Sequence, residues 1–300
     1  MQQWALTANT SANTPNAEGP QLAPNRTETF ISPTFAFAGT AAATGLWLAA
    51  LVAIPTLQSS GLSVIVARFV VHLIVLGGTW AGLSRTSLTT SARISTWLAI
   101  AIPLTIWHGA AWAIVANGLL LPGATSIPLL PLMIVVPTAV VITLLWRSRQ
   151  IGTLLDATPD HWLVGLQAYR VIGGVFLVNW LAGSTPAVFA VPAGTGDVIT
   201  GLMALPTALA LASGRPGSVR AAVLWNLFGI ADLVVAVTLG ALTSPGALQR
   251  LAFDHPNLTT GTYPTAIIPA FTVPTSLVLH ALSLRQLLRL RRARPVAPAA

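Results

Sequence analysis

Eight polar or charged side chains interrupt the apolar runs of this sequence, and these residue types can pair charges, bind ions or ligate cofactors. They are Arg68, His72, His108, Arg170, Asp197, Asn226, Asp232 and His280. A charged side chain at the centre of a bilayer costs about 2.5–3.5 kcal/mol on insertion scales, so it usually faces a partner or a water-filled cavity. We therefore expect these residues to face the interior of a helix bundle.

The position of each residue along its apolar run gives its depth, because a helix rises about 1.5 Å per residue. The predicted outer polar site contains Arg68, His72, His108, Asp197 and Asp232. The predicted inner cluster contains Arg170, Asn226 and His280. Depth favours an ion pair between Arg68 and either aspartate, whereas Arg170 would need Asp232 or an anionic ligand. A purely structural ion pair that locks helices together remains an alternative.

Asp197 stands in the stretch PAGTGDVITG, residues 192–201. Two prolines and three glycines between residues 183 and 196 predict a non-helical segment folded onto the outer mouth of the bundle. Asp197 would then lie in the first turn of the next helix, where its carboxylate can accept free backbone N–H groups. Alternatively, Gly194 and Gly196 admit a ligand and Asp197 binds its cationic or donor group. No strand precedes these glycines, so they are no dinucleotide-binding fingerprint.

Enzyme chemistry is not favoured by any motif in the chain. There is no Gly-x-Ser-x-Gly elbow and no His-Glu-x-x-His sequence, and the absence of cysteine excludes thiolate chemistry. No metal site and no cofactor are predicted. One alternative is a haem held through His72 and His108, since neutral imidazoles on consecutive helices can ligate haem iron.

The elements that must position these residues are membrane helices. Of the 300 residues, 54% are hydrophobic and only 7% are charged, against about 25% charged in soluble domains. We predict an all-α transmembrane bundle at residues 35–288, between a disordered polar tail at 1–34 and a basic cytoplasmic tail at 289–300. The eight predicted spans are residues 35–56, 61–83, 94–117, 127–146, 163–182, 196–213, 220–241 and 265–287.

Arginines set the predicted orientation. With eight spans, eleven arginines fall in the loops and tail on one side and only Arg250 on the other, so the positive-inside rule places both termini in the cytoplasm. We therefore attribute the net charge of +8 to arginines that set the orientation in the membrane. We expect the C-terminal arginines to face anionic lipid headgroups, and we predict no nucleic-acid binding. All fifteen cations are arginine, which suggests a GC-rich bacterial genome and hence a bacterial cytoplasmic membrane.

An internal echo suggests a duplication. VVPTAVVITLLWRSR at 135–149 resembles TVPTSLVLHALSLRQ at 272–286, and each closes a set of four predicted spans. A four-plus-four repeat would give two halves in the same orientation. Chance similarity between two apolar spans that end in arginine is the alternative.

The combination of YRVIGGVF, PAGTGDVITG, WNLFGIADLVVA and YPTAIIPAF, within residues 163–287, resembles a group of multi-pass bacterial membrane proteins that has no established activity. The resemblance implies membrane location and no residue roles. Three functions stay open: a small-solute transporter with a polar intramembrane site, a non-catalytic assembly subunit, and a haem-binding redox protein. Small-residue faces at 39–45 and at Gly77–Gly78 would permit close helix approach, in a homo-oligomer or with a partner.

Overall fold

A computed structural model describes residues 32–293, with side chains up to residue 289. This part of the chain is helical and contains no strand. Its elements are α1 (Pro33–Ala53), α2 (Pro55–Ser60), α3 (Leu62–Leu83), α4 (Thr90–Ala116), α5 (Leu129–Arg147), α6 (Arg149–Ala157), α7 (Asp160–Leu166), the 3₁₀ helix η1 (Gln167–Gly174), α8 (Val175–Leu181), α9 (Ala187–Ala212), α10 (Ser218–Thr243), the π-helix η2 (Ile268–Thr272) and α11 (Val273–Ala293).

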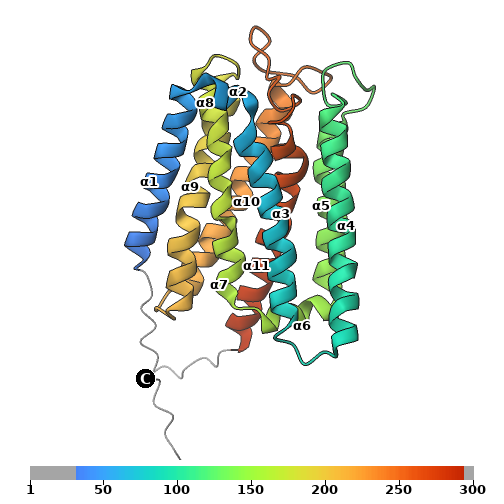
Figure 1. Ribbon diagram of the computed structural model, residues 1–300, viewed down its shortest axis with the longest axis vertical. Coiled ribbons are helices and arrows are strands. Elements are labelled where there is room, and N and C mark those ends of the chain that lie inside the picture. Colours follow the sequence, from blue (N-terminus) through green and yellow to red (C-terminus); the bar gives the residue numbers. More distant parts are fainter. Residues whose placement is uncertain (1–31, 294–300) are drawn as a thin grey trace, which may run out of the picture. The chain divides into compact units, whose positions relative to one another are not determined.

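Eight helical passes run alternately up and down the bundle: α1, α3, α4, α5, α7–η1–α8, α9, α10 and η2–α11 (Figure 1). One end of the bundle carries α2 and the segments 117–128, 182–186 and 244–267, and we refer to it as the α2 end. The opposite end carries α6 and the segments 84–89 and 213–217, and we refer to it as the α6 end (Figure 1).

Seven of these passes are long and apolar enough to cross a membrane. They correspond to the first seven predicted spans with small shifts at their ends, except that the sixth begins at Ala187 and not at residue 196. The eighth pass, η2–α11, is not among the seven, although a helix does occupy the eighth predicted position. Its mean hydropathy is lowered mainly by Arg285, Gln286 and Arg289 toward the end of the pass. Ser276, His280 and Ser283 form a row of buried polar side chains on the same helix.

The prediction of a non-helical segment at residues 183–196 is wrong. Helix α9 begins at Ala187 and contains Pro192, Gly194 and Gly196, so only residues 182–186 form the connection. Asp197 is consequently a mid-helix residue, about 15 Å along the axis from Ala187, and not part of a first turn. A broken backbone at this depth would leave polar groups without partners among apolar neighbours, a larger cost than proline and glycine in a helix.

Helix α9 lies at the centre of the packing and contacts α10, α7, η1, α8 and α1. Helix α11 packs against α5, α10 and α7, while α3 and α4 pack against each other and against η2. The largest hydrophobic core cluster lies between these groups and includes Phe176, Phe189 and Phe271. The central α9 and the polar α11 together position the groups described below.

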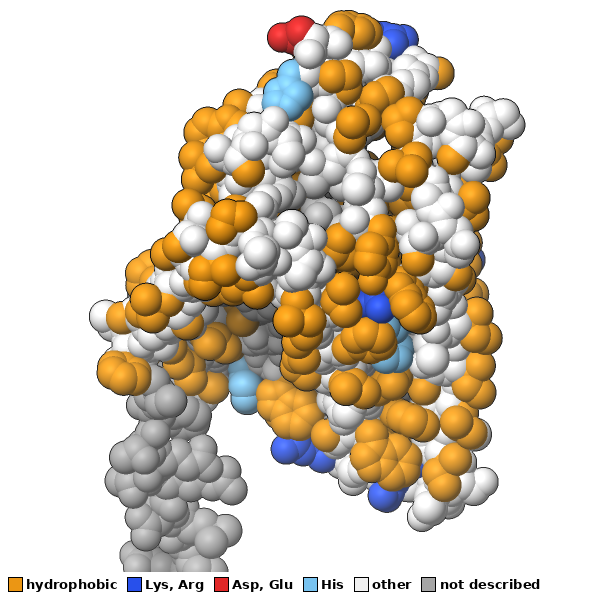
Figure 2. Space-filling view, turned by 45° about the horizontal axis from the view of Figure 1, so that its top comes forward, with side chains coloured by type: hydrophobic (Ala, Val, Ile, Leu, Met, Phe, Trp, Pro, Cys, Tyr) orange, Lys and Arg blue, Asp and Glu red, His pale blue; other side chains and the backbone are white. Residues whose placement is uncertain are grey.

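Apolar side chains cover the surface between the two ends, and basic side chains gather at the lower edge of the view in Figure 2. Arg85, Arg147, Arg215 and Arg285 belong to the α6 end, whereas the α2 end carries Arg250. Arg285 donates to the carbonyl oxygens of Leu145 and Ser148, at 2.5 and 3.1 Å. The distribution of arginine between the two ends is therefore strongly unequal in the described residues.

Helix α6 was expected to be an interhelical loop. Its serine cap, Ser148, accepts a hydrogen bond from the Ile151 N–H, and Ile151, Leu154 and Leu155 form its buried face. Gln286 of α11 donates to the carbonyl oxygen of Leu155 at 2.6 Å. Because its buried residues are spaced at helical intervals, α6 closes the end of the bundle.

The predicted tails at 1–34 and 289–300 lie partly outside the described residues. The parts that the structure describes are helical from Pro33, where α1 begins, and up to Ala293, to which α11 continues. The two segments of the internal echo fall in α5 and α11, which pack against each other and run in the same direction (Figure 1). The four-plus-four duplication itself stays a prediction.

Candidate functional site

Arg170 of η1 is the centre of a buried polar network. Its side chain is 1% exposed, and acceptors account for all five of its N–H groups. Nε and Nη2 donate to Asp197 Oδ1 at 2.7 and 2.5 Å, and Nη2 also donates to Asp232 Oδ2. Nη1 donates to the Gly229 carbonyl oxygen at 3.0 Å and lies 3.2 Å from His280 Nε2. One guanidinium thus joins α9, α10 and α11.

Each aspartate uses only one of its carboxylate oxygens for Arg170. Within the described residues, no hydrogen bond reaches Asp197 Oδ2 or Asp232 Oδ1. The side chains are 10% and 6% exposed, so both carboxylates are held almost entirely inside the bundle. Two close carboxylates in a low-dielectric interior need compensation, because a buried charge without a partner is strongly unfavourable.

Three glycines make the space for this network. A Cβ atom at Gly173 would collide with the carboxylate of Asp197, and one at Gly196 would collide with that of Asp232. A Cβ atom at Gly229 would lie 2.5 Å from the His280 ring and 3.1 Å from Arg170 Nη1. The glycine next to Asp197 in PAGTGDVITG therefore accommodates the second carboxylate.

The hydrogen bonds of His280 determine its protonation. Asn226 Nδ2 donates to the Ala222 carbonyl oxygen and to Ser283 Oγ, so its Oδ1 is the atom that accepts from His280 Nδ1 at 2.9 Å. Since a guanidinium can only donate, His280 Nε2 accepts from Arg170. His280 is therefore the neutral Nδ1–H tautomer and contributes no charge to the network.

The 3₁₀ helix η1 aligns Arg170 with its neighbours. Side chains three residues apart eclipse in a 3₁₀ helix, so Gln167, Arg170 and Gly173 form one line, and all three are buried. Gln167 Nε2 donates to the Ser276 carbonyl oxygen at 3.2 Å. The sequence shows that these three residues are spaced three apart. This spacing predicts that they share one buried face only if the segment is known to form a 3₁₀ helix.

Helix α11 supplies two polar residues that the sequence prediction omitted. Ser276 Oγ lies 2.7 Å from Tyr169 Oη, and Ser283 Oγ accepts from Asn226 at 3.1 Å. With His280 they occupy positions i, i+4 and i+7, which form one helix face. That polar stripe in an otherwise apolar run was the signal available in the sequence.

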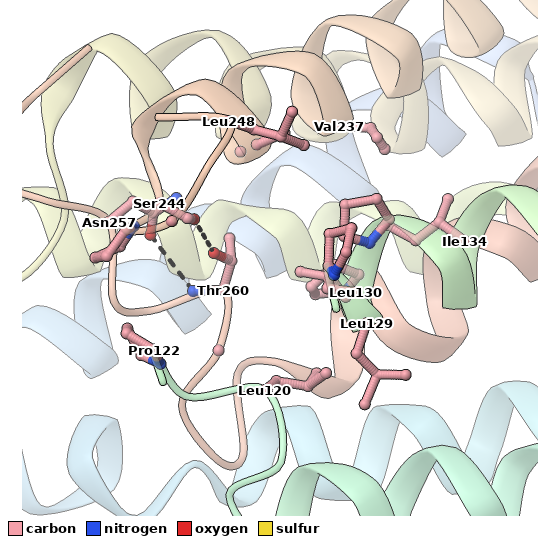
Figure 3. Close-up of a pocket in the computed structure, with 18 of the residues that line it drawn as sticks. Leu120, Pro122, Leu129, Leu130, Ile134, Val237, Ser244, Leu248, Asn257 and Thr260 are labelled. Carbon is pink, nitrogen blue, oxygen red and sulfur yellow. Dashed lines mark hydrogen bonds between the residues drawn. The ribbon is translucent and has the colours of Figure 1, made fainter. Parts of the chain in front are cut away.

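A cavity of about 310 Å³ leads from the α2 end to Asp197. Its mouth is formed by residues of the segments 119–128 and 244–261, and its depth by apolar side chains of α5, α8, α9, α10 and η2. Figure 3 shows Leu130, Ile134 and Val237 lining its depth. At the mouth, Ser244 Oγ and Thr260 Oγ1 are 3.0 Å apart (Figure 3). We refer to this cavity as the vestibule.

The predicted outer site is divided into two places. Asp197 and Asp232 belong to the Arg170 network, so the predicted ion pair of Arg68 with either aspartate is wrong. Arg68 instead packs over the rings of Phe69 and Trp112, with its Cζ 4.4 and 4.8 Å from their centroids. The depth estimate failed because it placed Asp197 at a helix end. The inner group, Arg170, Asn226 and His280, does lie together.

The imidazole rings of His72 and His108 lie against each other, tilted, between α3 and α4. Their ring centroids are 4.6 Å apart and their planes are inclined by 32°, and His72 Nε2 lies 3.2 Å from Thr105 Oγ1. Axial haem ligands face the iron from opposite sides with the metal between their nitrogen atoms, whereas the centroids of these two rings are only 4.6 Å apart. The described residues also contain no group of three or more His, Cys, Asp or Glu side chains arranged to hold a metal ion.

The space that Gly196 leaves for the Asp232 carboxylate leads to a testable prediction. Gly196→Ala is expected to lower the free energy of unfolding by about 1–3 kcal/mol, because overpacking forces the Asp232 carboxylate away from Arg170. Gly45→Ala in α1 is the matched control, since nothing lies within 4 Å of its added Cβ; it is expected to be neutral or slightly stabilising. Denaturant unfolding in detergent measures the free energy of unfolding of both variants. Equal values would contradict the role of Gly196 in accommodating the Asp232 carboxylate.

The family comparison covers the part of the chain that forms this network. The model of the family Domain of unknown function (DUF8737) matches residues 127–288, from the start of α5 into α11. The matched segment holds Arg170, Asp197, Asn226, Asp232 and His280, whereas Arg68, His72 and His108 precede it. No match was found among curated proteins or among solved structures. Because the match spans more than half of the 300 residues, the chain belongs to the DUF8737 family.

Proposed function

We propose that this chain is a multi-pass membrane protein of a bacterial cytoplasmic membrane, with its α6 end in the cytoplasm. The seven apolar helices of spanning length support membrane insertion. The arginines of the α6 end support the orientation through the positive-inside rule. In this orientation both predicted tails are cytoplasmic, and the vestibule opens on the outer side.

Within that setting, we propose that the protein is a transporter for a small, mainly apolar solute. The observation that carries this proposal is the vestibule, which connects the outer loops to a carboxylate in the bundle interior. An ion pair needed only for stability requires no opening to the aqueous side. Mainly apolar cavities with a few placed polar groups are typical of small-molecule sites.

The lining indicates the chemistry of the solute. Leucine, isoleucine, valine, phenylalanine, proline and alanine residues form most of the wall, and Asp197 is the charged residue that reaches it. A carboxylate oxygen without a partner accepts hydrogen bonds and attracts cations. We therefore expect a compact apolar solute that carries an amine or another donor group.

A solute screen with two matched variants tests this proposal. Val237 lines the vestibule, whereas Val234 on the same helix is 56% exposed and faces outward. In a thermal-shift screen of small amines and neutral analogues, wild type and Val234→Trp should be stabilised by the same compounds, and Val237→Trp should not. Flux of the stabilising compounds into proteoliposomes then separates transport from binding. If Val237→Trp keeps every shift, the vestibule is not the solute site.

A second cavity favours the assembly subunit as the other candidate function. A crevice of about 1490 Å³ lies between α3–α4–α5 and the passes that contain η1, α9 and α11. Val70, Ile74, Leu104 and Val140 are among its almost wholly apolar lining. A helix of a partner subunit or of a second copy would fill such a crevice by close packing. A defined oligomer in native mass spectrometry that Ile74→Trp disrupts would support this function.

A further inference from the structure

The charges of the Arg170 network do not balance. Arg170 contributes one positive charge, Asp197 and Asp232 contribute two negative charges when ionised, and His280 is neutral because its Nε2 accepts from Arg170. The sum is one net negative charge inside an apolar bundle. An uncompensated buried charge costs several kcal/mol, so the network requires one further positive charge.

Among the side chains that the structure describes, residues 32–289, no other one supplies that charge. Tyr169 of η1 is engaged with Ser276 Oγ, and α1 and α8, which pack on α9, contain no charged residue. Asp160 and His161 of α7 lie at the α6 end, at the start of their pass. Arg68 contacts the rings of Phe69 and Trp112 and neither carboxylate. The compensating charge must therefore come from outside the bundle.

The two unpartnered oxygens, Asp197 Oδ2 and Asp232 Oδ1, suit a proton better than a metal cation. Hard cations take about six or more oxygen ligands, and the described residues contain no acidic or histidine group of three or more arranged for a metal. Two carboxylates that meet at one Arg170 nitrogen are instead the arrangement in which one proton is shared, since like charges so close do not both persist.

We propose that Asp197 and Asp232 together hold one exchangeable proton, which is taken up from and returned to water of the vestibule. Uptake of the proton forms one O–H bond on a carboxylate oxygen and removes the net negative charge of the network. When a cationic group enters the vestibule, the proton is released to water and the carboxylate is restored. The proton site stands on the network alone. Its exchange against a solute rests on the proposed transport function, and coupled solute movement would then be proton-linked.

Three variants test the charge count. Asp197→Asn and Asp232→Asn each leave one carboxylate for Arg170 and need no proton, so each should fold. The double variant leaves Arg170 without an anion and should lose most of its folded yield. Wild type at neutral pH should show the infrared C=O band of a protonated carboxylic acid, in a position sensitive to deuterium, and both single variants should lack it.

The dependence of thermal stability on pH is a second measurement, and the proposal predicts its direction. If the folded state holds a proton that the unfolded aspartates release, the thermal midpoint falls as pH rises through neutrality, because the folded state binds more protons. Both single Asn variants should lose this part of the dependence. Absence of the infrared band in wild type, or equal stability of the double and single variants, would overturn the proposal.

The outcomes for the proton and for transport are distinguishable. Proton release on solute binding, measured with a pH indicator in weak buffer, should accompany binding of an amine to wild type. If the infrared band and its loss in the variants are found but no solute binds, the proton site stands and the transport function fails. Stabilisation of wild type by sodium ions, and not by protons, would overturn the inference directly.

Discussion

Arg170→Met is expected to lower the free energy of unfolding by about 3–5 kcal/mol, because it leaves two carboxylates buried without their shared cation. The guanidinium is 1% exposed and joins three helices through its contacts with Asp197, Asp232 and His280. Methionine fills much of the volume but supplies none of the five donors. Denaturant unfolding of the purified protein in detergent measures the loss.

Arg289→Met is the matched control for charge removal. Arg289 Nη2 lies 2.7 Å from Asp156 Oδ2, but the two side chains are 45% and 53% exposed. Exposed ion pairs contribute about 0–1 kcal/mol, so this variant should differ little from wild type. The triple variant with Arg170→Met, Asp197→Asn and Asp232→Asn should recover part of the stability. Equal losses at Arg170 and Arg289 would show that the buried network does not hold the helices together.

Phe271→Ala is the second change with a large expected effect, about 3–5 kcal/mol of unfolding free energy. The ring is fully buried in η2, and its centroid lies 4.6 Å from that of His108 and 6.2 Å from that of His72. Removing it leaves a cavity where α3, α4 and η2 meet. Thermal unfolding of the variant in detergent should show a correspondingly lower midpoint.

Phe35→Ala is the control for the loss of an aromatic ring. Phe35 is 70% exposed on α1, and an exposed substitution away from special contacts usually changes stability by less than about 0.5 kcal/mol. A Phe271 variant as stable as the Phe35 variant would mean that η2 is not the contact that holds α3 and α4 against the rest of the bundle.

The sequence was sufficient to predict the passes because bilayer-length apolar runs dominate the composition. The eighth was predicted from 265–287, and η2–α11 occupies it. The start of α9 was predicted wrongly because Pro192, Gly194 and Gly196 were assumed to break a helix, as they do in water. In an apolar bundle the intrahelical hydrogen bonds outweigh those local preferences, and the glycines provide close contacts to Leu177 and Asp232.

The candidate site was predicted only in part, and for a related reason. Arg170, Asn226 and His280 were grouped correctly by depth, since each lies well inside its helix. Asp197 was assigned to a helix end through the α9 error, and its wrong depth led to the wrong partner, Arg68. The eclipsed line of Gln167, Arg170 and Gly173 depends on the 3₁₀ geometry of η1, which tertiary packing determines.

Cysteine accessibility tests whether the vestibule admits water into the bundle from the outer side, as proposed here. The chain contains no cysteine, so single-cysteine variants need no background correction. In intact membrane vesicles of known orientation, a membrane-impermeant thiol reagent should modify Val237→Cys from the α2 side. Val234→Cys, three residues earlier on α10 and 56% exposed on the outer surface of the bundle, should remain unmodified, because in the proposed orientation that surface faces lipid. Modification of neither variant, or of both at the same rate, would contradict the account.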